Sequence, residues 1–524
     1  MFYTNNHIQY RNNRVIIRER IVIILKSQRK FGIILSYFYT AIHIVVNLIY
    51  VPLLLRTIGQ SEYGLYQLVG SLISYLSIME SLLSAAVVRY YCKYKNENNK
   101  IKMENVLAIS KKIYSFFSII VIVCGMILIF MFKNFYASSL SKFEMQESII
   151  MLILLIANIV INIMNYVYVA VITANEKFIF LKIISILSTI LQPIIVFLML
   201  TKYPYAFVIV IGLVLVNLVV AVTRKYYATE KLKAAIQYHG RDHEFVKGLF
   251  QLSTAILFAL IADQIFWKAD QLIIGKLLNT SAVAIYSVGS QIYMNYTPLG
   301  TAISSVFMSR LSKLYDVDKN MELISQLFIK VGKVAFIFLS MVLCGFILYG
   351  EEFILLWAGE GYKDAYYIAV IIMVPLTIDA MQNLGLTILQ VMNKYAFRGK
   401  VYFVIAVINI ITTIFLVDKI GIIGAAISTA ISMAVGNGLI MNIYYHKLGL
   451  NIMQFWKEII SYLPSIVIAF GCGIVLQGFN FGTAPINLII HILIFIIIYI
   501  LSVFVFGLRN NEKILIISKI KQLI

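Results

Sequence analysis

Long apolar segments recur along the whole chain, and they constrain its fold more than any other feature. Fourteen of them approach the length of about 20 residues that a helix needs to cross the hydrocarbon core of a bilayer. They cover residues 33–55, 63–88, 113–132, 148–172, 179–201, 203–222, 248–267, 282–309, 334–350, 366–392, 401–417, 420–444, 459–477 and 487–507. Charged residues make up only 13% of the chain, about half the share in soluble domains. We therefore predict an all-α integral membrane protein with 14 transmembrane helices.

The distribution of basic residues predicts the orientation of these helices. If the N-terminus is cytoplasmic, 36 of the 44 Lys and Arg residues fall in cytoplasmic segments and 8 lie outside. This split follows the positive-inside rule, so we expect both termini to be cytoplasmic. The net charge of +20 then needs no nucleic-acid partner. The basic segment 1–30 contains no signal peptide pattern; it is either an interfacial helix or an over-long gene start.

An internal repeat divides the predicted helices. Its matches are Tyr66 with Tyr286 at an offset of 220, Arg89 with Arg310 at 221, and Asn175 with Asn393, Lys182 with Lys400 and Tyr226–Tyr227 with Tyr444–Tyr445 at 218. The near-constant offset predicts two pseudo-symmetric six-helix halves followed by a two-helix hairpin, an architecture typical of alternating-access transporters. The expected parts are 1–30 (basic segment), 31–227 (first half), 228–247 (cytoplasmic linker), 248–446 (second half) and 447–524 (hairpin and basic tail).

Several stretches carry a family resemblance. They are "PLLLRTIGQSEYGLYQLV" (52–69), "VVRYYCKY" (87–94), "LLWAGEGYKDAYYIA" (355–369) and "DKIGIIGAAISTAIS" (418–432). The chain resembles, over roughly residues 31–450, the bacterial polysaccharide repeat-unit flippases for O-antigen or capsule. These belong to the superfamily of multidrug (MATE), oligosaccharidyl-lipid and polysaccharide exporters. It departs from many relatives at "MESLLSAAVVRYY" (79–91), where they have a glycine-rich segment and this chain has Glu80.

The resemblance implies a MATE-like fold and a flippase in the bacterial cytoplasmic (inner) membrane. Such a protein moves undecaprenyl-diphosphate-linked oligosaccharide repeat units from the cytoplasmic to the outer leaflet, for lipopolysaccharide or capsule biosynthesis. The expected partners are the lipid-linked substrate, membrane lipids, and the polysaccharide polymerase with its chain-length machinery; the chain is expected to act as a monomer. The alternative is a MATE-like, cation-coupled exporter of small organic cations. An acid-lined cavity would favour that alternative, whereas excess Lys and Arg favour an anionic lipid.

Polar side chains recur along single faces of several predicted helices. In the first helix Ser36, Thr40, His43, Asn47 and Tyr50 are spaced by 4, 3, 4 and 3 residues, which places them on one face. Asn158, Asn162 and Asn165 form a second stripe, and Gln382 and Asn383 belong to a third that follows the kink expected at Pro375. These stripes either hydrogen-bond between helices or line a hydrated cavity. On the second interpretation His43, Asn47, Asn162, Gln382 and Asn383 bind substrate.

Charged residues at two levels of the membrane are further candidates. Glu80, Asp263 and Asp379 are acids at membrane depth, which are costly and are usually functional, so we expect them to couple transport to H⁺ or Na⁺. Asp270 is expected nearer the outer surface, paired with Lys268 or Lys276. Arg89, Arg310, Lys182 and Lys400 recur at the cytoplasmic side. They either anchor the helices or collect a diphosphate headgroup.

Enzyme chemistry finds no support in the sequence. No GxxxxGK[ST] motif occurs, and the four cysteines form no CxxC pair. His239 and His243 have a metal-ligand spacing but lie in a charged loop, where we expect them to be solvated. The sequence therefore predicts a transporter without a metal or organic cofactor.

Overall fold

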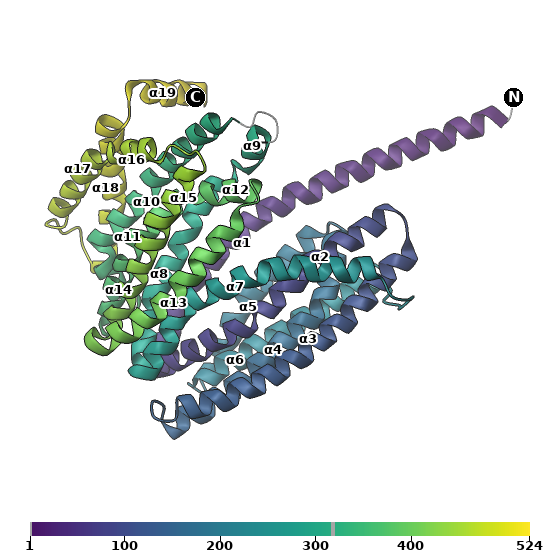
Figure 1. Ribbon diagram of the computed structural model, residues 1–524, viewed down its shortest axis with the longest axis horizontal. Coiled ribbons are helices and arrows are strands. Elements are labelled where there is room, and N and C mark those ends of the chain that lie inside the picture. The colour runs from purple at the N-terminus through teal and green to yellow at the C-terminus, as the bar shows by residue number, and fades with distance from the viewer. Residues whose placement is uncertain (1–2, 316–319, 524) are drawn as a thin grey trace. The chain divides into compact units, whose positions relative to one another are not determined.

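The computed structural model describes the backbone of residues 3–315 and 320–523 (Figure 1). Side chains are described except at 3–30, 33, 81–86, 251–256, 258–259, 309, 515–516 and 519–523. Within these residues the regular structure is entirely helical, as a chain surrounded by hydrocarbon requires, because a helix satisfies its own backbone hydrogen bonds. The all-α prediction is confirmed. The side chains of the basic segment 1–30 lie outside the described residues.

The chain forms two compact units, Met1–Ile261 and Ala262–Ile524. The first holds α1 (Tyr3–Leu76), α2 (Ile78–Asn96), α3 (Lys100–Phe135), α4 (Lys142–Ala174), α5 (Phe178–Leu200), α6 (Ala206–Tyr226), the π-helix η1 (Tyr227–Lys231) and the start of α7 (His243–Leu277). The division between the units falls inside α7. The predicted boundaries at 228–247 and at 447 stay predictions.

The second unit continues with more and shorter helices. They are α8 (Thr280–Ser305), α9 (Met308–Lys313), α10 (Met321–Trp357), η3 (Glu360–Tyr362), α11 (Lys363–Met381), α12 (Asn383–Val391), α13 (Tyr395–Ile420), α14 (Ile422–Met433), η4 (Ala434–Ile440), α15 (Met441–Lys447), α16 (Ile452–Ile460), α17 (Leu463–Leu476), α18 (Ala484–Ser502), η5 (Val503–Gly507) and α19 (Asn510–Leu523). α17 and α18 both pack on α10, where Tyr349 donates to the Gly473 carbonyl at 3.1 Å and Ser340 bonds Tyr499 at 2.7 Å.

Eleven helical stretches in the described residues are long and apolar enough to cross a membrane. The first predicted segment and most of the second, 63–88, fall together in one such stretch, Ile34–Glu80, and the second continues into α2. The predicted segment 248–267 falls in α7, and 282–309 covers most of α8 and reaches the start of α9; none of these helices is among the eleven. The chain is thus a multi-pass membrane protein. The number of 14 spans and the hairpin arrangement stay predictions.

Helix starts recur between the two units at the offset that the sequence predicted for Arg89 and Arg310. α3 and α10 start 221 positions apart, and so do α4 and α11. The residues that cap α3 and α10 are both asparagines: Asn99 accepts from the Lys102 amide at 3.0 Å, and Asn320 accepts from the Leu323 amide at 3.2 Å. Each cap satisfies a backbone donor that a helix start leaves free. The repeat is therefore visible in local structure as well as in sequence.

At the next turn the structure corrects the predicted register by one residue. Glu176 after α4 and Asn393 after α12 have φ of 54° and 55°, an offset of 217 rather than 218. The rings of Phe180 and Tyr227 stack at 3.7 Å, and those of Phe397 and Tyr444 stack at the same distance. Asn175 and Asn393 match in residue type but not in conformation. The equivalent positions are Glu176 and Asn393, because these two residues have the left-handed backbone conformation of the turn.

This correction affects two of the candidate basic residues. At an offset of 217, Lys182 corresponds to Gly399, and Lys400 corresponds to Ile183. One residue on a helix is a rotation of about 100°. Lys182 and Lys400 are therefore not structurally equivalent, whereas Lys177 and Lys394, at the starts of α5 and α13, are.

Gly59 breaks α1 within the stretch "RTIGQSEYGLYQLV". Its φ of 80° and ψ of 178° belong to a region that is essentially restricted to glycine. The corresponding break in the second unit separates α7 from α8 at Asn279, whose side chain caps α8 by accepting from the Ala282 amide at 2.8 Å. Asn279 follows Gly59 by 220 positions, the offset predicted from Tyr66 and Tyr286.

An ion network fastens the last helix to α10. Lys333 donates to Glu458 at 2.9 Å and to Glu512 at 2.8 Å, and Arg509 donates to Glu458 at 2.5 Å. Burial alone would raise the pKa of Glu512, but the hydrogen bond from Lys333 and the other donors around it outweigh burial and lower the pKa. α19 is therefore held most firmly while Glu512 is ionised, and the attachment weakens as the pH falls through that lowered pKa.

Replacing Gly59 tests the break in α1. Because no atom lies within 4 Å of a Cβ built there, Gly59→Ala changes backbone strain alone, and we expect it to lower the free energy of unfolding by about 1–3 kcal/mol. Gly70→Ala is the matched control, since Gly70 lies in the helical part of α1 and is equally uncrowded; it should stabilise by about 0.5–1 kcal/mol. Thermal unfolding of the purified protein measures both. Equal effects of the two substitutions would contradict the assigned strain.

Candidate functional site

Arg398 is the central charge of a polar cluster in the second unit. α13 places it between two tyrosines, three residues after Tyr395 and four before Tyr402, so all three side chains share a helical face. Its two terminal nitrogens donate to the Tyr395 and Tyr402 hydroxyls, each at 3.1 Å. The guanidinium carbon lies 4.5 Å from the Tyr402 ring centroid. The buried Nε has no partner among the described residues, so Arg398 keeps one donor unused.

Two of the predicted acids face this arginine. Asp379 lies on α11 one turn after Pro375 and is half-buried, whereas Asp263 on α7 is exposed. The charge of Arg398 acts on both carboxylates, yet no ion pair within 4.0 Å joins them in the described part of the chain. The structure thus brings Asp263, Asp379 and Arg398 into one electrostatic cluster without pairing them directly.

Amide side chains extend the cluster and are largely satisfied by one another. Gln382 and Asn442 exchange hydrogen bonds at 2.9 and 3.2 Å, and Trp456 donates to Asn442 at 3.0 Å. Asn437 donates to Tyr402 at 3.0 Å. Asn383 donates to Ser304 at 2.5 Å. Both predicted residues of this stripe, Gln382 and Asn383, therefore make the interhelical hydrogen bonds of the first interpretation.

The first unit contains a smaller polar cluster. Asn162 on α4 donates to Glu80 on α2 at 3.3 Å. Arg224 on α6 is half-buried, and its Nε lacks a partner in the described residues. On α1, Asn47 bonds His43 at 3.0 Å, and His43 is exposed. Glu80 and Asn162 thus meet as a pair, and so do His43 and Asn47.

Three of the four predicted headgroup residues are solvent-exposed. Arg89, Arg310 and Lys400 form no hydrogen bond or ion pair with any side chain that the structure describes. Lys182 is half-buried, with its Nζ 5.3 Å from the centroid of the Tyr39 ring. The geometry leaves these charges available to a ligand.

The prediction for Asp270 is wrong. The residue is 2% exposed and pairs with neither Lys268 nor Lys276. Its carboxylate accepts hydrogen bonds from Tyr286 at 2.5 Å, Thr429 at 2.6 Å and Thr413 at 3.0 Å. The sequence suggested lysines because they are neighbours along α7, but partners from α8, α13 and α14 converge on the carboxylate instead.

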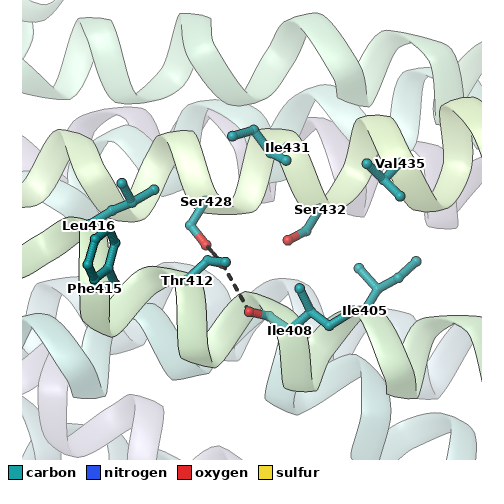
Figure 2. Close-up of a pocket in the computed structure, with 9 residues that line it drawn as sticks. All are labelled: Ile405, Ile408, Thr412, Phe415, Leu416, Ser428, Ile431, Ser432 and Val435. Carbon is teal, nitrogen blue, oxygen red and sulfur yellow. Dashed lines mark hydrogen bonds between the residues drawn. The ribbon is translucent and has the colours of Figure 1, made fainter.

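A groove of about 200 Å³ opens between α13 and the α14–η4 stretch (Figure 2). Its lining is Ile405, Ile408, Thr412, Phe415, Leu416, Ser428, Ile431, Ser432 and Val435. The Thr412 hydroxyl bonds Ser428 and the Ile408 carbonyl, so little hydrogen-bonding capacity is left there. The groove is too apolar to hold a sugar or a diphosphate. No group of three metal-ligating His, Cys, Asp or Glu side chains occurs in the part searched, the described residues.

The sequence missed Arg398 and Arg224. Arg398 lies in the basic stretch 394–400, which is typical of a cytoplasmic segment in the positive-inside pattern. Its tyrosines at i−3 and i+4 were the available sign that it faces the protein interior. The sequence gives less indication that Arg224 is buried, since it is one of the basic residues in the last turn of α6.

The chain is similar to proteins of polysaccharide biosynthesis. A family profile described as "Polysaccharide biosynthesis protein" matches residues 53–367. A Shigella flexneri protein described as an O-antigen transporter is 21% identical over 402 residues, which cover 75% of this chain and 91% of the relative. The capsular polysaccharide biosynthesis protein CapF of Staphylococcus aureus is 25% identical over 232 residues, 43% of this chain and 56% of the relative. These matches confirm the resemblance seen in the sequence.

Solved structures share the fold. The lipid II flippase MurJ in an inward closed conformation superposes with a TM-score of 0.72 at 16% identity, covering 90% of this chain and 98% of that chain. An inward-facing multidrug MATE transporter gives a TM-score of 0.64 at 13% identity, with 79% and 96% covered. The MATE-like fold class is thereby confirmed.

The coupling between Arg398 and Asp379 is testable by a double-mutant cycle. Arg398→Met removes the two hydrogen bonds to Tyr395 and Tyr402 and the positive charge that acts on Asp379, and we expect a loss of stability of about 1–3 kcal/mol. Adding Asp379→Asn should recover part of that loss. Lys394→Met, at an exposed position beside the same helix start, should change stability by less than about 0.5 kcal/mol. Strictly additive effects in thermal unfolding would show that the two charges do not interact.

Proposed function

Because the chain belongs to the polysaccharide biosynthesis protein family, we propose that it is a flippase for undecaprenyl-diphosphate-linked oligosaccharide repeat units. It would move them from the cytoplasmic to the outer leaflet of the bacterial inner membrane by alternating access, for O-antigen, lipopolysaccharide or capsule biosynthesis. The family match over residues 53–367 carries this proposal. The relatives described as an O-antigen transporter and a capsular polysaccharide biosynthesis protein support it, as does the fold shared with a lipid II flippase.

The alternative, a cation-coupled exporter of small organic cations, is not favoured. The MATE structures support the fold alone, since their identity to this chain is low. In the second unit Asp263 and Asp379 face Arg398, and Asp270 accepts hydrogen bonds from three hydroxyls. These features suit a transporter with an anionic substrate better than one for cations.

The diphosphate headgroup is proposed to be collected by Arg89 and Arg310, with Lys182 and Lys400 contributing charge. The support is that Arg89, Arg310 and Lys400 are exposed and unpaired among the described residues. An arginine can offer a phosphate two parallel hydrogen bonds, which a lysine cannot. The helix starts that follow at the same offset of 221 support treating the two arginines as counterparts, while Lys182 and Lys400 are one residue out of register. We therefore assign the larger share of binding to the arginines.

The sugar portion is proposed to meet His43, Asn47, Asn162, Gln382 and Asn383. Gln382 and Asn383 would have to exchange their present partners for sugar hydroxyls, so their contribution requires a rearranged state. His43 is already exposed. We further propose that the chain works as a monomer alongside the polymerase and chain-length machinery.

Removing both arginines tests headgroup binding. A charge-assisted hydrogen bond is worth about 1.5–3 kcal/mol, so Arg89→Ala with Arg310→Ala should lower surface polysaccharide at least tenfold and accumulate lipid-linked precursor in the inner leaflet. Lys111→Ala with Lys330→Ala removes equal charge at exposed positions and should have little effect. Normal surface polymer in the arginine double variant, at matched protein abundance, would mean that both arginines only anchor their helices at the cytoplasmic side.

Labelling of an introduced cysteine tests the orientation of the chain. If both termini are cytoplasmic, a cysteine in place of Glu360 should react with a reagent added outside the cell.

Glu80, Asp263 and Asp379 are proposed to couple transport to H⁺ or Na⁺. The support is that Asp263 and Asp379 share one arginine, so the binding of a cation changes the balance of the cluster. Asp379→Asn and Asp263→Asn should each reduce export at matched expression and alter its dependence on pH or Na⁺. Asp364→Asn, an exposed acid at the start of the same helix as Asp379, is the control. Normal export with unchanged ion dependence in both variants would make these acids structural.

A further inference from the structure

Two carboxyl groups in the first unit meet at the start of α6. The Ala206 amide donates to Glu62 at 2.8 Å, and the next amide, of Phe207, donates to Glu147 at 3.4 Å. Because consecutive amides bind them, the two carboxyl groups come within hydrogen-bonding reach of each other. Glu62 follows the break at Gly59 in α1, and Glu147 lies on the first turns of α4. The pair therefore ties three helices together at one end.

Glu147 lacks a partner that its burial requires. It is 3% exposed, and its Oε2 makes no hydrogen bond with any described residue. A buried carboxylate oxygen without a donor is costly, on the order of 1–3 kcal/mol or more. The missing element is thus a donor or a cation at Oε2.

No basic side chain fills this role. The basic residues at the neighbouring helix ends are Arg56 on α1, Lys133 on α3, Lys142 on α4 and Lys202 before α6, and all four are exposed. None of them forms an ion pair with Glu62 or Glu147 in the described part of the chain. The remaining charged group nearby is a third acid, Glu144, which caps α4 and accepts from Ser61 at 3.1 Å.

The start of α6 can offset only part of the charge of two ionised carboxylates. Its free amides and the helix dipole amount to roughly half a positive charge. Two ionised carboxylates in contact would repel each other, and such pairs in proteins hold one proton between them. A single proton on Glu147 Oε2 would give that atom its missing hydrogen bond, donated to the Glu62 carboxylate, and would leave one negative charge facing the helix.

We propose that Glu62 and Glu147 form a proton-binding site that clamps α1, α4 and α6 together at the end of the first unit that we expect to face the outside. Loss of the proton leaves two adjacent negative charges and loosens the three helices. The clamp therefore responds to the pH of that compartment. The site does not depend on which substrate the protein carries, and none of the acids considered for ion coupling belongs to it.

Infrared difference spectroscopy on the purified full-length protein tests the shared proton directly. Spectra recorded at acidic and at alkaline pH should contain a protonated-carboxyl band that disappears on proton release. Glu147→Gln and Glu62→Gln should each remove this band, since either substitution leaves one carboxylate and no shared proton. Glu144→Gln keeps the capping box and should retain the band. A band identical in the wild type and in both variants would overturn the proposal.

Stability provides a second readout should one variant fold poorly. The folded wild type holds a proton that the unfolded chain releases near the ordinary glutamate range of about 4.3, so its unfolding temperature should fall as the pH rises through release from the pair. Glu147→Gln mimics the protonated form and should flatten that dependence, whereas Glu144→Gln should follow the wild type. Equal slopes in wild type and Glu147→Gln would contradict the clamp. Because neither measurement involves export, their failure leaves the proposed flippase function untouched.

Discussion

Hydrocarbon offers no hydrogen bonds, and most of this structure follows from that constraint. Backbone groups must be satisfied inside each segment, so the described chain is helical. Side chains obey the same demand: Asp270 receives three hydroxyls, Gln382 and Asn442 satisfy each other, and Lys333 binds two glutamates. Arg398 Nε and Glu147 Oε2 are exceptions, because each is buried without a hydrogen-bond partner among the described residues.

The sequence predicted the features that depend on periodicity and chain statistics. The apolar segments, the all-α class and the repeat at offsets of 220 and 221 all rest on signals spread over many residues, so single substitutions do not obscure them. The register at the turn after α4 depends on one backbone angle, and matching asparagines displaced it by one residue. Because residue 176 is a glutamate, its residue type gives almost no indication that its φ is positive.

The site was less predictable, because its partners come from distant parts of the chain. The sequence marks Asp379 and Asp263 as unusual acids, but Arg398, which faces both, lies in a basic stretch that resembles the other anchoring charges. Asp270 was assigned to its neighbours along α7 although its ligands lie up to 159 positions away. Glu62 and Glu147 drew no attention, since each lies at the polar end of a predicted span, where an acid is ordinary. Their significance arises only when α1, α4 and α6 meet.

The break between α11 and α12 lies where the two copies differ in length. Between the helix starts at Lys142 and Lys363 and the turns at Glu176 and Asn393, the offset between the units drops from 221 to 217. The 33-residue α4 corresponds to α11 and α12 of 19 and 9 residues joined at Gln382, so the two copies differ by four residues in this element. Four residues are close to one helical turn, about 6 Å of length. A length difference of this size keeps the downstream faces nearly aligned, whereas one or two residues would rotate every later side chain away from its neighbours. The break at Gln382 thus lies in the element where the two copies differ by about one helical turn.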